Sequence, residues 1–326
     1  MAVYTQLDQQ QIADYLDPFN LGELMGFKGI SGGVENTNYF VTTQVPGQPK
    51  HDYVLTLFED LGYDELPYFV ALTEHLVEHG VTVPAPLRDE FGTALRRLAA
   101  RPALLFPRFA GDHLPRSAIS PNTCTIMGQQ LAKMHKAGQS FDLQRQAHRG
   151  QAWWTELGPR AAACINAEEA DLLLGTINIY QDMLQTGIEL PRGVIHGDLF
   201  HDNALFEGEQ FSAIIDLYNA CDDFLLYDVA VAVNDWCING DGSINEDLYL
   251  AFIEAYHQTR PFTNAEAEYW SIMLQTAAMR FWLSRLETYH SLDSHQRDAG
   301  VTVLKDPAAI RDILRLRQQH QHLLPL

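Results

Sequence analysis

Basic residues are scarce in this 326-residue sequence. Lys and Arg total 22 against 42 Asp and Glu, which gives a formal net charge of -20 at pH 7. Binding to a nucleic-acid backbone requires clustered cations that neutralise phosphates, and the sequence has no such cluster. We therefore expect no nucleic-acid partner. An anionic ligand must be bound locally, by a few groups or by a metal ion.

Cysteines and long apolar runs are also scarce. The four cysteines are widely spaced and form no C-x-x-C pair, which is typical of reduced thiols rather than of a disulfide framework or a zinc site. The N-terminal segment lacks a basic start followed by an apolar core, and runs such as DVAVAV are too short to span a bilayer. These features predict a soluble, cytoplasmic globular protein without a membrane partner. The sequence carries no signal for an oligomeric state.

Secondary-structure patterns divide the chain into two parts. ELMGFKGI, NTNYFVTT, YVLTLFE, TALRRLAA and RPALLFPRF have strand-like alternation or β-branched and aromatic content, and DELPYFVALTEHLVEHG has apolar residues at helical spacing. From Gly111 onward long helical patterns dominate, interrupted by a stretch at 193–216 that we expect to be compact and poor in strands. We predict an α+β protein with an N-terminal lobe at 1–107 and a helical C-terminal lobe at 108–326. A ligand site is expected where this interruption meets the junction of the lobes.

The interruption contains HGDLFHDN, residues 196–203. A metal cluster of the histidines and aspartates is one interpretation, but it leaves the downstream FSAIID unexplained. A polar loop with capping aspartates is another. A phosphoryl-transfer loop explains more: Asp198 would accept the proton of an attacking hydroxyl, and Asn203 would bind Mg²⁺. A second magnesium ligand is then required soon after, and Asp216 supplies it at the end of an apolar strand.

Together, HGDLFHDN and IIDLYNA resemble the catalytic core of the aminoglycoside phosphotransferase and choline kinase superfamily, which shares the protein-kinase-like fold. With GVENTNYFV, YVLTLFE and DLYNACDDFLLYDVAVAVNDWC, the chain is most similar to the bacterial homoserine kinases of that superfamily. The resemblance implies a bilobal fold with an antiparallel sheet in the small lobe, and the cofactors ATP and Mg²⁺. It implies Asp198 as the catalytic base, and Asn203 and Asp216 as the metal ligands. Asp228 would hold the catalytic-loop backbone, and His196 would buttress it. The nucleotide-binding residues would be Gly32, Gly33, Asn36, Val54, Thr56 and Glu74.

One position departs from the pattern of the superfamily. The strand YVLTLFE should present a Lys or Arg to the phosphates, paired with the helix residue Glu74, but the matching residue is Thr56. Val54 and Thr56 share one face of an alternating strand, so a hydroxyl points where a cation is expected. Glu74 is then left without an obvious partner. Neutralisation of the phosphates must depend more on magnesium, or on another residue such as Lys28.

The substrate implied by the resemblance, L-homoserine, is a zwitterion. Its pocket needs a cation for the carboxylate and an anion for the ammonium. We predict that Arg280 binds the carboxylate and Asp235 the ammonium, with Trp236 beside them. Solvation, or pairing with structural carboxylates, is the alternative for Arg280 and for its neighbour Arg285.

These observations predict an ATP-dependent homoserine kinase, a phosphotransferase with an alcohol acceptor that makes O-phospho-L-homoserine for threonine biosynthesis. A kinase of the same superfamily acting on an aminoglycoside, choline or methylthioribose is an alternative. A non-catalytic nucleotide-binding module is another, because a cation is missing at Thr56. Such modules usually lose the base or the metal ligands as well, and here Asp198, Asn203 and Asp216 are all present.

Overall fold

The chain divides into two compact units. The computed structural model describes residues 4–30, 36–292 and 306–326. One unit comprises Met1–Gly111 and Ser212–Ile215, and the other comprises Asp112–Phe211 and Asp216–Leu326. The return of 212–215 to the first unit has no signal in the sequence. It is stabilised by a hydrogen bond from the Ile214 N–H to the Thr82 carbonyl at 3.0 Å. The chain therefore passes from the first unit to the second directly at Asp216.

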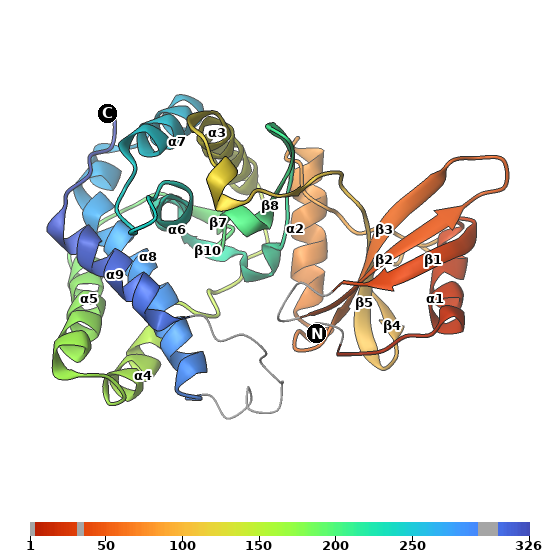
Figure 1. Ribbon diagram of the computed structural model, residues 1–326, viewed down its shortest axis with the longest axis horizontal. Helices are drawn as coiled ribbons and strands as arrows, with labels where there is room; N and C mark the ends of the chain where they lie inside the picture. The colour runs from red at the N-terminus through yellow and green to blue at the C-terminus, as the bar shows by residue number, and fades with distance from the viewer. Residues whose placement is uncertain (1–3, 31–35, 293–305) are drawn as a thin grey trace. The chain divides into compact units, whose positions relative to one another are not determined.

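The first unit is built around an antiparallel sheet (Figure 1). Five of its described strands pair in the order β1-β2-β3-β5-β4. The predicted strands and the predicted helix are confirmed. The elements are α1 (Gln9–Leu16), β1 (Glu23–Gly29), β2 (Asn36–Gln44), β3 (Lys50–Phe58), α2 (Leu66–Glu78), β4 (Arg96–Leu98) and β5 (Arg101–Pro107).

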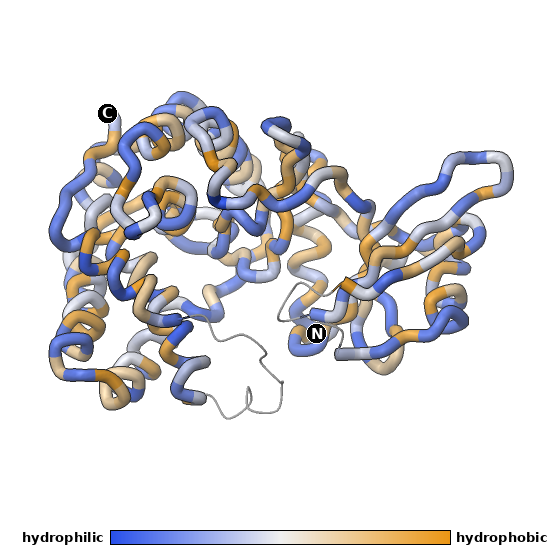
Figure 2. Tube along the Cα trace, in the orientation of Figure 1, coloured by the Kyte–Doolittle hydropathy of each residue, from blue (hydrophilic) through white to orange (hydrophobic). Residues whose placement is uncertain are grey.

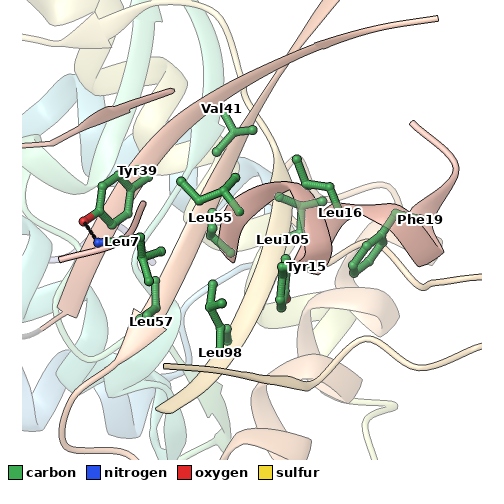
Figure 3. Close-up of a cluster of buried hydrophobic side chains, with 12 residues drawn as sticks. Leu7, Tyr15, Leu16, Phe19, Tyr39, Val41, Leu55, Leu57, Leu98 and Leu105 are labelled. Carbon is green, nitrogen blue, oxygen red and sulfur yellow. Dashed lines mark hydrogen bonds between the residues drawn. The ribbon is translucent and has the colours of Figure 1, made fainter. Parts of the chain in front are cut away.

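The core of this unit lies between α1 and one face of the sheet. Helix α1 begins at a capping box in which the Asp8 side chain accepts from the Gln11 N–H, and the Gln11 side chain accepts from the Asp8 N–H. Alternate residues of β2 and β3 form this core together with residues of α1 and Leu7, whose N–H donates to the Tyr39 hydroxyl at 3.0 Å (Figure 3). The cluster includes Ile12, Tyr15, Leu16, Tyr39, Val41, Leu55, Leu57 and Leu105. Because side chains alternate along a strand, the sites at Val54 and Thr56 are left on the opposite face of β3.

The second unit is mostly helical. Figure 2 shows hydrophobic and hydrophilic stretches alternating within its helices, as expected for helices with one buried face. Helix α6 differs because every residue from Leu225 to Trp236 is buried. It therefore forms part of the centre of this unit. The helices are α3 (Pro121–Gly138), α4 (Gln151–Ala162), α5 (Ala167–Gln185), α6 (Leu225–Trp236), α7 (Glu246–Thr259), α8 (Asn264–Tyr289) and α9 (Pro307–Gln319).

The prediction that 193–216 is poor in strands was wrong. The stretch contains three short strands, β7 (Arg192–Ile195), β8 (Ala204–Glu207) and β9 (Gln210–Ile214). Strand β7 pairs with β10 (Cys221–Phe224), and β8 pairs with β6 (Asp112–His113). Four or five residues are too few to show a clear alternation in sequence. The HGDLFHDN loop is consequently anchored at both ends by strands.

No helix in the described ranges is long and apolar enough to cross a bilayer.

Candidate active site

The start of the HGDLFHDN loop is clamped by Asp228 of α6. One carboxylate oxygen accepts from the His196 N–H at 2.7 Å, and the other accepts from the Gly197 N–H at 2.8 Å. The His196 ring nitrogen Nδ1 in turn accepts from the Asp198 N–H at 3.3 Å. The predictions that Asp228 holds the loop backbone and that His196 buttresses it are confirmed.

His135 of α3 supports this clamp from within the core. Its Nε2 lies 3.0 Å from the Asp228 carboxylate, and its Nδ1 lies 2.7 Å from the Tyr256 hydroxyl. Burial lowers the pKa of His135, so the neutral ring donates through Nε2 and accepts from the tyrosine. Burial alone would raise the pKa of Asp228, but hydrogen bonds from His135 and the loop backbone bring it below its ordinary value. Asp228 is therefore an anion at neutral pH.

The lowered pKa of His135 predicts a dependence of stability on pH. Between its unfolded pKa of 6.5 and its lower folded pKa, the unfolded chain binds the extra proton. The free energy of unfolding therefore falls as pH falls through this window, with a slope of at most about 1.4 kcal/mol per pH unit. We expect His135→Gln to show a smaller decrease than the wild type between pH 7 and 5.5. Urea unfolding at several pH values measures this, and parallel curves for the two proteins would contradict it.

Gly197 is required by the shape of the loop. Its φ is +76°, and an added Cβ would lie 3.0 Å from the Asn219 carbonyl oxygen. Both the left-handed conformation and the close approach disfavour any other residue. The turn at Gly197 determines how the next residue, the predicted base Asp198, leaves the clamp.

Asn203 closes the loop on Asp198. Its Nδ2 donates to the Asp198 carbonyl at 2.7 Å and lies 3.5 Å from the Asp198 carboxylate. With the amide nitrogen directed to Asp198, the amide oxygen points away and is a hard donor suitable for a divalent cation. The structure thus brings the predicted base and one predicted metal ligand together.

Asp216 has an unusual backbone conformation. It lies two residues after the end of β9 with φ 61° and ψ 53°, in the left-handed region where Asp and Asn are the most tolerated residues after Gly. Its side chain is exposed, although the next residue, Leu217, is buried. An exposed carboxylate on a constrained turn suits the predicted role of a metal ligand, which stays a prediction.

Asp235 does not have the surroundings that the sequence led us to expect. One of its oxygens is paired with the Arg116 guanidinium, and the other accepts from the His201 N–H and lies 2.7 Å from His201 Nδ1. Burial alone would raise the pKa of Asp235, but the His201 contacts and the Arg116 charge bring it below its ordinary value. Because its partners already neutralise this anion, we replace the prediction that it binds the substrate ammonium. Asp235 instead fixes the turn at 201–203, which carries Asn203.

Trp236 also has a structural environment. Its side chain has no exposed surface, and its indole N–H donates to the Leu199 carbonyl at 3.1 Å. A fully buried ring offers a ligand no contact surface. Trp236 therefore supports the HGDLFHDN loop from behind, and we no longer place it in the substrate site.

The predicted nucleotide residues belong to the first unit. Gly32 and Gly33 lie outside the described residues. Asn36 begins β2, and Val54 and Thr56 lie on β3. The Thr56 hydroxyl donates to the side-chain oxygen of Asn38, its neighbour across the two strands, at 2.7 Å. Their roles in nucleotide binding stay predictions.

The expectation that Glu74 lacks a partner was wrong. Arg88 binds its carboxylate through two parallel hydrogen bonds, at 2.7 and 2.8 Å. Such a bidentate pair places a cation beside the helix glutamate, although the strand position holds Thr56. The sequence contained Arg88 only as one residue of a loop 14 positions later, so no local spacing indicated this contact.

An antiparallel sheet in one unit, and a loop with the predicted base and amide ligand in the other, are the features expected of the predicted protein-kinase-like class. Residues 26–262 match the phosphotransferase enzyme family. The chain is similar to a homoserine kinase of Methylobacillus flagellatus, at 42% identity over 97% of this chain and 95% of the relative. It is similar to a homoserine kinase of Pseudomonas aeruginosa, at 39% identity over 100% of this chain and 99% of the relative. The chain belongs to the phosphotransferase enzyme family, and these relatives in it are homoserine kinases.

Solved structures support the same fold. An amicoumacin kinase in complex with AMP-PNP and Ca²⁺ matches with a TM-score of 0.69 at 15% identity, covering 96% of this chain and 93% of that one. A choline kinase from Cryptosporidium parvum matches with a TM-score of 0.66 at 12% identity, covering 96% of both chains. The predicted protein-kinase-like α+β fold is confirmed by these likenesses.

Proposed function

We propose that this chain is an ATP-dependent homoserine kinase. It transfers the γ-phosphate of ATP to the side-chain hydroxyl of L-homoserine, giving O-phospho-L-homoserine and ADP for threonine biosynthesis. The observation that carries the proposal is the identity of 37–42% to homoserine kinases across at least 97% of this chain. The four free cysteines support the prediction that the enzyme works in the reducing cytoplasm.

Asp198 is the base of this reaction. It is partly exposed, while the residues on either side, Gly197 and Leu199, are buried. The carboxylate is thus presented from a clamped backbone, where it can orient the homoserine hydroxyl and accept its proton as the oxygen attacks the γ-phosphorus. The bond from phosphorus to the ADP oxygen breaks as the new bond forms. Positioning on a rigid loop supplies much of the rate enhancement.

Asn203 and Asp216 fit the requirements of a magnesium ion shared with the nucleotide. No group of three or more His, Cys, Asp or Glu side chains that could hold a metal occurs in the part of the chain that the structure describes. Mg²⁺ in kinases, however, takes one or two protein oxygens and completes its shell with phosphates and water. The Asn203 amide oxygen and the exposed Asp216 carboxylate are donors of this kind. When bound, the ion neutralises charge on the phosphates.

Thr56 is the nucleotide-site residue that is most directly testable. We expect Thr56→Val to raise the KM for ATP about two- to tenfold, the range of one lost hydrogen bond. Thr42→Val is the matched control, since the Thr42 hydroxyl also donates across β2 and β3, to Asp52 at 2.6 Å. Steady-state kinetics at saturating homoserine measure both. An unchanged KM in Thr56→Val would remove this residue from the nucleotide site.

An acceptor panel tests the proposed function. ADP release is measured with L-homoserine, serine, threonine, choline, kanamycin and methylthioribose, in the wild type and in Asp198→Asn. We expect L-homoserine to have the highest kcat/KM and the variant to lose the activity. Preference for another alcohol would overturn the substrate, and no turnover with any acceptor would favour a nucleotide-binding module.

A further inference from the structure

A concavity beside the catalytic loop lies entirely within the second unit. Its empty volume, which includes space open to solvent, is about 360 Å³. Gly197, the residue before the predicted base, forms part of its wall. The lining residues that matter for binding are Gly197, Asn219, Asp223, Tyr227, Arg149 and Arg280. The concavity therefore contains groups of both charges next to the catalytic loop.

Arg280 of α8 is the cation of this concavity. The residue is only 5% exposed, and its guanidinium lies 4.0 Å from the centre of the Phe281 ring. Among the described residues it makes no hydrogen bond or ion pair. A buried guanidinium without an anion is costly, so this arrangement favours a ligand that brings a carboxylate. Arg149, in contrast, already donates to the Ser284 hydroxyl at 3.0 Å.

Asp223 of β10 is the anion of the concavity. Its side chain is 15% exposed, and the Arg192 guanidinium lies 3.4 Å from one oxygen. Burial raises the pKa of Asp223, which indicates that nearby cations compensate its charge incompletely. A ligand ammonium would favour the ionised form.

The position of the concavity suits a short amino acid with a hydroxyl at its end. In homoserine the hydroxyl oxygen and the carboxylate carbon are separated by four bonds, about 5 Å when extended. A substrate whose hydroxyl meets Asp198 must therefore have its carboxylate and ammonium bound close to Asp198, and the concavity includes the adjacent residue, Gly197.

We propose that this concavity binds the α-amino-acid end of the acceptor, with Arg280 holding the carboxylate and Asp223 the ammonium. The inference rests on the proposed function, because it names the recognition groups for the acceptor of that reaction. It retains Arg280 from the sequence prediction and replaces Asp235 by Asp223. Alcohols without a zwitterionic end lack the groups that these two side chains recognise.

The test compares variants with truncated acceptors. 3-Aminopropan-1-ol is homoserine without its carboxylate, and 4-hydroxybutyrate is homoserine without its ammonium. We expect Arg280→Gln to lower kcat/KM for L-homoserine about 100-fold, in the range for loss of one partner of a buried charge pair. The kcat/KM for 3-aminopropan-1-ol, which has no carboxylate to lose, should change less than about threefold in this variant. Asp223→Asn should likewise lower kcat/KM for L-homoserine but leave kcat/KM for 4-hydroxybutyrate, which has no ammonium, nearly unchanged. Arg280→Lys should recover part of the loss, because it keeps the charge but not the bidentate geometry.

The controls separate this inference from the proposed function. Arg315→Gln, which removes an arginine paired with Glu168 on the surface, should retain wild-type kinetics. Turnover of L-homoserine by the wild type tests the function alone. Calorimetric titration of L-homoserine into the wild type and Arg280→Gln tests the inference whether or not turnover occurs, and a rise in Kd of at least about 30-fold supports it. Equal Kd values, or equal losses on full and truncated acceptors, would overturn it.

Discussion

Replacing Asp198 by Asn is expected to lower kcat about 1,000-fold, within the range for loss of a general base. Asparagine keeps the size of the side chain and can still face Asn203, whose amide nitrogen lies 3.5 Å from the Asp198 carboxylate. It cannot accept the proton of the acceptor hydroxyl. The KM values for ATP and homoserine should change less than about threefold, because the loss falls on the transition state. Steady-state and single-turnover kinetics measure the effect.

Asp202→Asn is the matched control for this change. Asp202 lies in the same loop, and its side chain is exposed. Asp202→Asn removes one negative charge from the loop, as Asp198→Asn does, so an effect of the loop's overall charge would appear in both variants. We expect less than a threefold change in kcat for Asp202→Asn. Similar losses in the two variants would contradict the role of Asp198 as the base.

Replacing Asp216 by Asn is expected to lower kcat/KM for ATP by at least about 100-fold at millimolar Mg²⁺. Mutation of a residue that only hydrogen-bonds to a metal ligand already lowers metal affinity or activity about 10- to 100-fold. The amide keeps an oxygen donor but loses the charge that attracts the ion. The Mg²⁺ concentration at half-maximal activity should therefore increase, and high Mg²⁺ should restore part of the rate. A titration of activity against Mg²⁺ at fixed ATP measures this.

Glu207→Gln provides the control for Asp216. Glu207 ends β8, and its side chain is exposed, so the variant loses one negative charge between Asn203 and Asp216 in the sequence. We expect its Mg²⁺ requirement to equal that of the wild type. An unchanged Mg²⁺ requirement in Asp216→Asn would exclude Asp216 as a metal ligand.

The fold was largely predictable where elements were long or regular. Strand β2 alternates between intermediate and buried residues along its whole length, and α3, α5 and α8 exceed 17 residues. Helix α6 was not predicted as a helix, and because all of its residues are buried it has no solvent-exposed face. Strands β7 and β8 were missed because they have only four residues each. A hydrophobic period is visible in a sequence only when an element has one buried and one exposed face and is long enough to repeat the pattern.

The candidate site was predictable where its residues are close in sequence. The spacing of Asp198, Asn203 and Asp216 was sufficient to propose the base and the metal ligands. The clamp of Asp228 on Gly197, 31 residues away, was predicted only through the resemblance to the superfamily. The environment of Asp235 depends on Arg116, which is 119 residues away. Long-range pairs of this kind leave no local signal. For the same reason the sequence could not show that Asp223 lines the concavity with Arg280 while Asp235 is already paired.

The central claim is that this chain phosphorylates the hydroxyl of L-homoserine. Mass spectrometry of a reaction containing the purified chain, ATP, Mg²⁺ and L-homoserine tests it most directly, with ADP measured in the same sample. We expect O-phospho-L-homoserine in amounts equal to the ADP released, and about 1,000-fold less of both products when Asp198→Asn replaces the wild type at equal concentration and time. ADP accompanied by free phosphate, with homoserine unmodified, would contradict it.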